Sequence, residues 1–490
     1  MLIVNDKKPH KINYLFKTLN FKYRESIIIN LIWRMKGKIL SVIASLNNKI
    51  NKGHERSVKA KKNILASFII RGCNIIISLV MVPLTIHYIN PTQYGIWLTL
   101  SSIISWFTFF DIGFGNGLRN KFAEAIAKGD HHLARIYLST TYAILSMIIA
   151  FVLIIFFCIN PFLNWSTILN APAGMAGELS TLALLVFVFF CIQFVLQLIT
   201  TIITANQQPA RASFFNFLGS IFSLGIIFLL TKTTSGNLTY LGLSLGVTPV
   251  LVLTASSIWF YTHDYKKFAP AVKYIKLTYA RNLMSLGVKF FIIQIAAIIF
   301  YETSNIIITQ LFGPAQVTTY NIAYKYFSII PMVMGIIMMP FWSAFTEAWV
   351  KKDIQWIKTT MRKIRVIWLL LTGVTLVMLI FSNFIYELWV GRQIIIPISV
   401  SASIAGYVII NGWNAIYSQF LNGTGKIKMQ LYFALGGSLV NIPLAVFLGK
   451  NLGIYGVILS TTLISLIIAV FSPIQYSKII NNRALGIWAK

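Results

Sequence analysis

The chain has 490 residues, of which 57% are hydrophobic and only 11% are charged. Its mean hydropathy of +0.74 lies well outside the range of soluble globular domains and excludes that class. Its formal net charge of +30 would suggest nucleic acid as a partner, but only if the basic residues gathered on one soluble surface. The composition therefore predicts an integral membrane protein.

Residues 1–60 form a basic extension that we expect to lie in the cytoplasm. The extension has neither the apolar core nor the small-residue cleavage site of a signal peptide, so we assign no leader to it. Its apolar segment 26–46 carries Arg34, Lys36 and Lys38 in the middle. This pattern favours a helix in the membrane interface over a helix that crosses the bilayer.

Beyond the extension, apolar stretches recur that are long enough, at about 1.5 Å per residue, to cross a hydrocarbon core of roughly 30 Å. Hydrocarbon offers no partner to open backbone groups, and the alternating pattern of a barrel is absent, so all of them are predicted to be helices. The sequence thus predicts an all-α integral membrane protein of about twelve transmembrane helices. The approximate spans are 64–86, 93–117, 138–160, 179–204, 212–231, 239–262, 285–311, 317–345, 366–388, 394–420, 429–449 and 453–477.

The basic residues are distributed very unevenly between the two sides of these spans. With the N-terminus inside, 37 of the 42 lysines and arginines fall on the cytoplasmic side, and only Lys232, Arg392 and Lys450 fall on the other. This asymmetry predicts that both termini are cytoplasmic. It also indicates that the net charge faces anionic lipid at the cytoplasmic surface and not nucleic acid.

One short motif occurs twice, as GLRNKFAEAIAKGD at 117–130 and PFWSAFTEAWVKKD at 340–353. Seven identities share a constant offset of 223 residues. An internal repeat of this kind decides the architecture of a chain. The matched pairs are Pro91 and Pro314, Gln93 and Gln316, Phe122 and Phe345, Glu124 and Glu347, Ala125 and Ala348, Lys128 and Lys351, and Asp130 and Asp353.

The repeat predicts two parallel six-helix units, because an even number of crossings keeps both copies in one orientation. We expect an N-lobe at 61–262, a basic cytoplasmic linker at 263–284 and a C-lobe with a short tail at 285–490, with a cleft between the lobes. The motif itself is interpreted as a cytoplasmic helix turn. Glu124 and Lys128 would form an i,i+4 pair, and Asp130 and Asp353 would cap the helices that follow.

Several patterns that suggest enzymatic chemistry are incomplete. GFGNG at 113–117 ends a membrane helix and does not follow a strand, and GTGK at 423–426 lacks the rest of a nucleotide-binding loop. The six histidines lie in tails or at loop ends, and the cysteines Cys73, Cys158 and Cys191 lie in different spans without metal or redox spacing. We therefore expect no catalytic residue, metal or cofactor.

Charged residues within apolar spans are the most informative candidates, because each costs roughly 2.5 to 3.5 kcal/mol at a helix centre. Arg71 and Asp111 lie at matching depth on consecutive spans, and Glu302 and Lys325 lie nearer the midplane on the first two spans of the second lobe. Two interpretations remain open for each couple. They form structural ion pairs, or they face a water-filled cavity.

Two stretches carry a resemblance to a known family: GVKFFIIQIAAIIFYETSNIIITQLFGPAQVTTYNIAYKYF at 287–327 and DIGFGNGLRNKFAEAIAKGD at 111–130. The sequence resembles the Wzx-type O-antigen and exopolysaccharide flippases of the multidrug/oligosaccharidyl-lipid/polysaccharide exporter superfamily, from about residue 60 to 478. The resemblance implies two lobes around a cationic cavity in the bacterial inner membrane. It also implies export of an undecaprenyl-pyrophosphate-linked oligosaccharide, with H⁺ or Na⁺ as coupling ion and other polysaccharide assembly proteins as partners.

Under this interpretation Arg71, Lys289 and Lys325 would contact the lipid diphosphate, while Asp111 and Glu302 would balance their charge or take protons. Lys289 lies so near the end of its span that its ammonium group can also reach the interface. The tyrosines Tyr320, Tyr324 and Tyr326 would stack on sugar rings or pack between helices.

Two other functions remain open from the sequence. A cation-coupled multidrug exporter would share the superfamily fold, but its cavity should favour acidic and apolar residues. A membrane polysaccharide polymerase or glycosyltransferase should carry acidic or histidine residues in a sizeable outer loop, whereas the longest one here, 161–178, has only Glu178.

Overall fold

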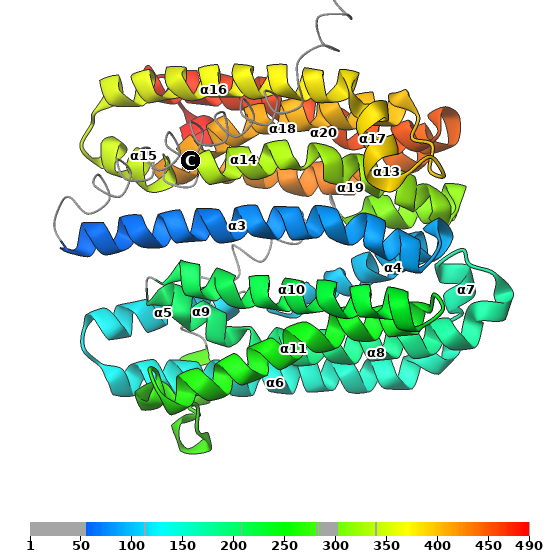
Figure 1. Cartoon of the computed structure of the whole chain (residues 1–490). Helices are drawn as coiled ribbons and strands as arrows, with labels where there is room; N and C mark the ends of the chain where they lie inside the picture. Colours follow the sequence, from blue (N-terminus) through cyan, green and yellow to red (C-terminus); the bar gives the residue numbers. More distant parts are fainter. Residues whose placement is uncertain are drawn as a thin grey trace, which may run out of the picture. The chain divides into compact units, whose positions relative to one another are not determined.

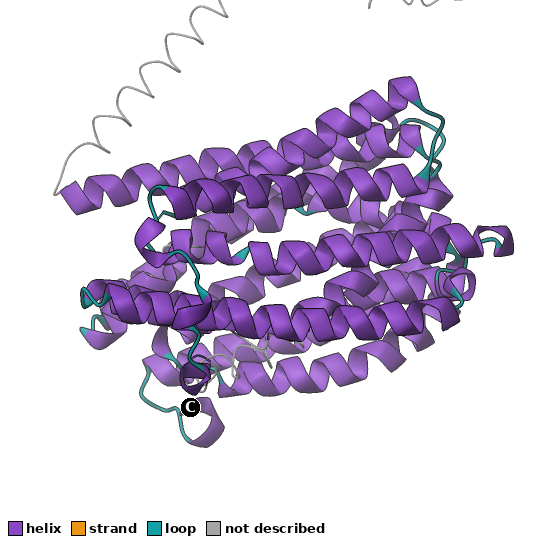
Figure 2. Ribbon diagram, turned by 90° about the horizontal axis from the view of Figure 1, so that it is seen from below, coloured by secondary structure: helices purple, strands orange, loops and turns teal. Residues whose placement is uncertain are grey.

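The computed structural model describes residues 55–111, 114–206, 208–280, 283, 302–338 and 341–489 (Figure 1). The chain divides into two compact units, Met1–Ala66 and Ser67–Lys490. The predicted interfacial helix at 26–46 lies outside the described residues, and the account below concerns the second unit. Its described residues form helices, turns and loops, with no strand among them (Figure 2). The all-α class predicted from the apolar spans is confirmed.

The amino-terminal half runs from the first long helix to the basic linker. Its helices are α3 (Glu55–Tyr88), α4 (Pro91–Ser105), α5 (Phe114–Ala127), α6 (His131–Ile159), α7 (Trp165–Ile168), α8 (Ala176–Leu196), α9 (Leu198–Ala205), α10 (Pro209–Thr233) and α11 (Leu238–Thr262). Within this half α8 packs on α6 and α11, α10 packs on α9 and α11, and α5 packs on α6 and α9.

The carboxy-terminal half begins, among described residues, with the helical segment 302–312. The helices that follow are α13 (Pro314–Phe327), α14 (Ile329–Met338), α15 (Phe341–Val350), α16 (Ile354–Ile380), α17 (Ser382–Val390), α18 (Ile398–Thr424), α19 (Lys428–Leu452) and α20 (Ile454–Ile480). Helix α18 is the centre of this half, since α13, α14, α15, α16 and α20 all pack against it.

Eight helices in the described part of the chain are long and apolar enough to cross a membrane, and the count rises to nine if the bent pair α13 and α14 is one span. They coincide with eight of the predicted spans: the first, the third to sixth, the ninth, the eleventh and the twelfth. Most of the seventh span lies outside the described residues. The total of twelve therefore stays a prediction.

Three predicted spans differ from straight apolar helices. The second ends as α4 at Ser105 and continues through a 3₁₀ turn at Trp106–Asp111. The eighth bends by 40° between α13 and α14, where Pro331 has no N–H to donate in the first turn of α14. The tenth, α18, is long enough but carries serine and asparagine side chains along its length, as expected for a helix surrounded by protein.

The repeat is visible in backbone geometry as well as in sequence. Gly129 and Lys352, which are 223 residues apart, both adopt left-handed backbone conformations, with φ of 75° and 56°. Three backbone N–H to C=O bonds recur at the same offset. They are Gly129 to Ile126, Asp130 to Ala125 and His131 to Gly129 in the first copy, and Lys352 to Trp349, Asp353 to Ala348 and Ile354 to Lys352 in the second.

The predicted caps are confirmed in both copies. The carboxylate of Asp130 accepts from the backbone N–H of Leu133 at 2.8 Å, and that of Asp353 accepts from Trp356 at 2.9 Å. The Glu124–Lys128 pair also forms, at 2.7 Å, and the hydrogen bond from Lys128 is the main cause that lowers the pKa of the Glu124 carboxyl to about 2. The chain has thus built the same turn twice.

The basic linker packs against the amino-terminal half. Arg135 of α6 donates from Nε to the carbonyl of Ala269 at 2.8 Å, and its guanidinium lies 4.2 Å from the ring centroid of Tyr274. Further along, the backbone N–H of Lys276 donates to the hydroxyl of Thr140 at 3.0 Å. These contacts fix the course of the linker over α6.

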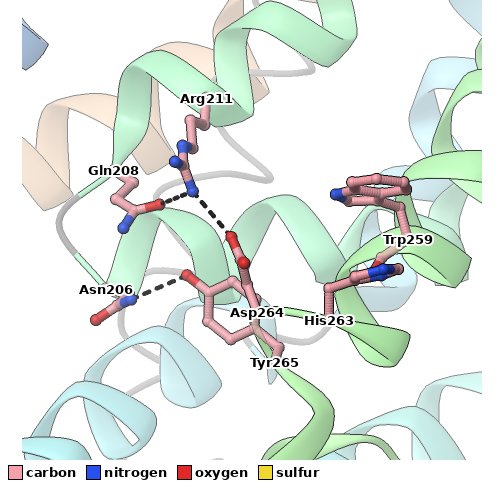
Figure 3. A network of polar contacts seen from close by, with 7 residues as sticks. All are labelled: Asn206, Gln208, Arg211, Trp259, His263, Asp264 and Tyr265. Atoms are coloured by element: carbon pink, nitrogen blue, oxygen red, sulfur yellow. Dashed lines mark hydrogen bonds and ion pairs between the residues drawn. The ribbon is translucent and has the colours of Figure 1, made fainter.

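A polar network fastens the start of the linker to the turn between α9 and α10 (Figure 3). Arg211 donates to Gln208 and to Asp264, both at 3.1 Å. Beside it the amide of Asn206 donates to the hydroxyl of Tyr265 at 3.0 Å. The Arg211–Asp264 ion pair is exposed, so we expect it to contribute little to the free energy of unfolding. Its role is to fix the orientation of the two turns.

Candidate substrate cavity

From Ser67 onward, helix α3 has α10 of its own half on one side and α14 of the carboxy-terminal half on the other (Figure 1). Near its carboxyl end Val82, Thr85 and Tyr88 are buried, and the Tyr88 hydroxyl is 2.9 Å from that of Thr234. Further back along the helix Ile76 is 61% exposed, while Ser67 is 3% exposed. The carboxyl end of α3 is therefore anchored by buried contacts.

A proline within α3 creates a contact to the carboxy-terminal half. Pro83 has no N–H, so the carbonyl of Leu79 four residues earlier lacks its usual helical donor. The indole Nε1 of Trp389 in α17 donates to this carbonyl at 2.9 Å. Trp389 thereby supplies the donor that Pro83 cannot.

A cavity of about 560 Å³ lies between α3, α10 and α14, so both halves line it. Its volume is within the range of small-molecule sites, roughly 300 to 1,000 Å³. The lining residues are Arg71, Asn74, Ile75, Ser78, Ser220, Pro331, Met332, Gly335 and Ile336. The cleft expected between the two repeats is thus present as a cavity between their helices.

Arg71 is the only charged residue that lines this cavity. It is exposed, and in the described part of the chain it makes neither a hydrogen bond nor an ion pair. One turn along the same face, Asn74 has a buried side-chain oxygen without a hydrogen-bond partner, and Ser78 follows on the next turn. This stripe offers a cation, an amide and a hydroxyl to an anionic, hydroxylated ligand.

Of the two possible ion pairs left open by the sequence, the structure describes both side chains of only one, Glu302 and Lys325. Glu302 and Lys325 do not pair, and Glu302 instead lies beside the hydroxyl of Ser102. Both side chains are half-buried at similar depth, but they face different neighbours. The structural-pair interpretation is therefore wrong for this couple. The side chain of Asp111 lies outside the described residues, as does the whole of Lys289.

The three candidate tyrosines occupy two different environments. Tyr320 and Tyr324 have ring centroids 5.8 Å apart and line a small cavity together with Ser304 and Tyr407. Tyr326 is buried, and its hydroxyl donates to the carbonyl of Met378 at 3.1 Å. Its ring packs edge-on against Tyr386, with ring centroids 5.3 Å apart. Both the hydroxyl and the ring of Tyr326 are therefore in contact with protein.

The two halves meet where α4 and α13 begin. A Cβ atom on Gly95 would lie only 1.7 Å from the carbonyl oxygen of Pro314, so glycine alone permits this crossing. The hydroxyls of Thr99 and Thr309 are 2.5 Å apart at full burial, and the hydroxyl of Thr318 donates to the carbonyl of Pro91 at 2.6 Å.

A chain of polar side chains extends this contact toward the middle of the helices. The amide of Asn305 donates to the hydroxyl of Ser102 at 2.8 Å, and Asn321 donates to the side-chain oxygen of Asn305 at 2.7 Å. Near the end of the helical segment 302–312, Gln310 donates to the carbonyl of Ile168 in α7 at 2.6 Å. These bonds hold the halves together at one end, away from Arg71.

The sequence identified Arg71 but missed the uncharged polar residues around it. Asn74, Ser78 and Ser220 are single polar positions in apolar helices, and such positions are common where helices pack. The helical spacing of Arg71, Asn74 and Ser78 at i, i+3 and i+7 was the available signal.

The all-helical fold, its apolar helices and the cation-bearing cavity between its halves agree with a membrane transporter, and the family profiles and relatives of the chain assign it to that class. The profile of the polysaccharide biosynthesis protein family matches residues 60–345, and a second profile, MatE, matches 290–447. The chain belongs to the polysaccharide biosynthesis protein family.

Its relatives are transport proteins by description. A protein of Yersinia pseudotuberculosis described as an O-antigen export protein is 20% identical over 73% of this chain and 82% of its own length. A protein of Salmonella typhimurium described as an O-antigen transporter is 23% identical over 86% of this chain and 96% of its own length.

A solved structure shares the fold. It is the inward-facing conformation of a multidrug resistance MATE family transporter, with a TM-score of 0.70 and 13% identity over 83% of this chain and 94% of that one. This similarity extends over both halves. At such low identity it concerns the fold alone.

Proposed function

We propose that the protein moves an undecaprenyl-pyrophosphate-linked oligosaccharide from the inner to the outer leaflet of the bacterial cytoplasmic membrane, by alternating access and without covalent change. Family membership and the relatives described as O-antigen transporters support export of a polysaccharide precursor. The observation that carries the proposal is the unpaired guanidinium of Arg71 on a cavity lined by both halves. A diphosphate is a ligand that arginine binds with two parallel hydrogen bonds.

The remaining candidate residues have secondary roles in this proposal. Lys325, which has no acidic partner among the described residues, and Lys289 would supply further positive charge along the path. Glu302 and Asp111 would balance that charge or carry the protons of an H⁺-coupled cycle, with Na⁺ as the other coupling ion considered. Tyr320 and Tyr324 would contact sugar rings, and Tyr326 is the weakest candidate because its hydroxyl already has a protein partner.

The proposed orientation gives the observed contacts a functional meaning. With both termini in the cytoplasm, the ends at which α4 and α13 begin face outward, and the bonds between the halves would close the cavity on that side. We further propose that the six-helix lobes at 61–262 and 285–490 are the moving bodies. Anionic lipids would contact the basic cytoplasmic segments, including the linker at 263–284, and other assembly proteins would receive the exported unit.

A cation-coupled multidrug exporter is the second candidate, because the fold matches a MATE transporter. Arg71 argues against it, since an unpaired cation in the cavity would repel cationic drugs. Deletion of the gene distinguishes the two. A flippase mutant accumulates lipid-linked repeat units on the inner leaflet, whereas a drug-exporter mutant keeps its surface glycan and becomes sensitive to cationic compounds. Single units that accumulate on the outer leaflet would instead indicate a polymerase.

The site is tested by returning Arg71→Ala and Arg71→Lys to the deletion strain at matched protein levels. We expect Arg71→Ala to reduce surface glycan at least tenfold, because the loss of a charge-assisted hydrogen bond costs about 1.5 to 3 kcal/mol. Arg71→Lys should retain an intermediate level, since lysine keeps the charge but loses the paired geometry. Export at the wild-type level by Arg71→Ala would exclude Arg71 as a ligand.

A further inference from the structure

A second cavity, of about 430 Å³, lies in the amino-terminal half and is lined by α3, α8, α10 and α11 and by Gln197 at the junction of α8 and α9. No charged residue lines it. Its polar lining consists of three amides and two serines, and apolar and aromatic side chains complete it. The lining residues are Met81, Gln193, Gln197, Phe215, Asn216, Gly219, Ser220, Ser223, Leu245, Pro249 and Leu253.

The three amide side chains have no hydrogen-bond partner in the part of the chain that the structure describes. Gln193 of α8 and Gln197 lie one helical turn apart, and Asn216 of α10 lines the same cavity. Gln193 is half-buried, and Gln197 and Asn216 are exposed. Each amide offers two N–H donors and one carbonyl acceptor. Since polar groups within a membrane protein are normally paired, three free amides around one space indicate a ligand that both donates and accepts.

The backbone adds an acceptor to the same cavity. Pro249 lies inside α11 and has no N–H, so the carbonyl of Leu245 lacks its usual helical donor. Both residues line the cavity. The hydroxyl of Ser223 is held in place by hydrogen bonds with Thr248 and with the carbonyl of Ser244. Phe215 supplies an aromatic surface beside these polar groups.

Ser220 lines both this cavity and the one that contains Arg71, so the two spaces adjoin across one residue of α10. The lining of the cavity that contains Arg71 is cationic, and the lining of the second cavity is neutral. A ligand that spans both must carry an anionic group followed by an uncharged part rich in hydroxyls. A drug-like cation fits neither space.

We propose that the cavity lined by Gln193, Gln197 and Asn216 binds an uncharged sugar ring of the substrate while Arg71 holds the adjoining diphosphate. This assignment rests on the proposed function, since it divides one lipid-linked oligosaccharide between two spaces. The amides and the Leu245 carbonyl hydrogen-bond to the sugar hydroxyls, and Phe215 packs against the ring. Amides adapt to several hydroxyl arrangements, so the site tolerates different sugars.

The test compares two probes on purified protein in lipid nanodiscs, with binding followed by native mass spectrometry. One probe is the lipid-linked repeat unit extracted from cells that lack the gene, and the other is undecaprenyl pyrophosphate without sugar. We expect the Gln193→Leu, Asn216→Leu double variant to bind the sugar-bearing lipid about tenfold more weakly, and the bare lipid as wild type does. The double alanine variant adds no bulk and should show the same selective loss.

Gln355→Leu is the matched control, because it removes an exposed amide at the start of α16, far along the chain from either cavity. Equal affinity of wild type and both double variants for the sugar-bearing lipid overturns the proposal, as does an equal loss for both probes. Arg71→Gln separates this inference from the function on which it rests. If Arg71→Gln binds both probes as wild type does, the diphosphate assignment fails, and the sugar site is judged by the difference between the probes alone.

Discussion

The two halves of the molecule share a helical plan but differ in how they use polar side chains between neighbouring helices. In the carboxy-terminal half, Asn441 of α19 is 1% exposed and accepts from the hydroxyls of Ser460 and Thr461 of α20 at 3.0 and 3.3 Å. In the amino-terminal half, Asn216 of α10 is exposed to a cavity and makes no side-chain hydrogen bond among the described residues.

The basic side chains show the same difference. Arg365 of α16 lies over the rings of Tyr417 and Tyr476, at 5.6 Å from each centroid, within the packed carboxy-terminal half. Arg71 of α3 lines a cavity and makes no hydrogen bond or ion pair in the part of the chain that the structure describes. A repeated fold therefore need not give two equivalent sites. Arg71 and Asn216 of the amino-terminal half line cavities, whereas Arg365 and Asn441 of the carboxy-terminal half contact neighbouring side chains.

The largest effect on surface glycan is expected from a disulfide that links the two halves at their contact. In a variant without Cys73, Cys158 and Cys191, the pair Thr99→Cys and Thr309→Cys should form a disulfide on oxidation, because the two hydroxyls are in contact. The link prevents the halves from separating at that end, so surface glycan should fall to the level of the deletion strain and recover with reductant.

A pair within one half serves as the control for this link. Asn441→Cys with Ser460→Cys joins α19 to α20, and we expect it to leave export within about twofold of the cysteine-free parent, because a link inside a rigid body does not oppose its motion. Full export by protein whose Thr99–Thr309 link is complete by mass spectrometry would contradict separation of the halves at this contact.

The next largest effect on export is expected when Arg71 and Arg365 are each replaced by glutamine. Arg71→Gln should lower export at least tenfold and leave the midpoint of thermal unfolding unchanged, because the side chain makes no hydrogen bond or ion pair among the described residues. Arg365→Gln should lower stability by about 0.5 to 2 kcal/mol through the loss of its aromatic contacts, while export per folded molecule stays within about twofold. Fluorescence-monitored unfolding in detergent and a glycan assay on the same preparations decide this. The reverse pattern would place the ligand in the carboxy-terminal half.

The sequence was informative wherever one local rule decides the structure. Apolar length predicted the helices, and Asp130 and Asp353 predicted caps because capping involves only neighbouring residues. The constant offset predicted turns that recur in detail, down to the left-handed residue in each. These features depend on contacts within a few residues of the chain.

The sequence was less informative where the direction of a side chain matters. Glu302 and Lys325 were placed at similar depth, but depth along a helix does not fix the side on which a residue lies, and the two do not meet. Pro83 leaves the carbonyl of Leu79 without a helical donor, but nothing local in the sequence identifies Trp389, 306 residues after Pro83, as its partner. The free amides were equally hidden, because an uncharged polar residue in an apolar helix is as often paired as unpaired.

A smaller effect is expected at the two asparagines. Asn441→Leu removes the acceptor of the Thr461 hydroxyl and leaves the Ser460 hydroxyl with the carbonyl of Val457, so it should lower the free energy of unfolding by about 1 to 3 kcal/mol. Asn216→Leu breaks no bond to the described residues and should not lower it. Thermal unfolding of the two variants in one detergent measures the difference. Equal destabilisation would mean that the amino-terminal amide is as structural as its carboxy-terminal counterpart.

The smallest effect is expected at the turn that the two halves share. Lys352 holds a left-handed conformation that costs an ordinary residue about 1 to 2 kcal/mol, whereas glycine adopts it freely but loses roughly 0.5 to 1 kcal/mol through the entropy of the unfolded chain. Lys352→Gly should therefore stabilise the protein by no more than about 1 kcal/mol, and Gly129→Ala should destabilise it by a similar amount. Gly174→Ala is the control, because a Cβ atom there meets open space, as at Gly129, without positive φ. If Gly129→Ala and Gly174→Ala shift the unfolding midpoint equally, backbone strain does not distinguish the two copies of the turn.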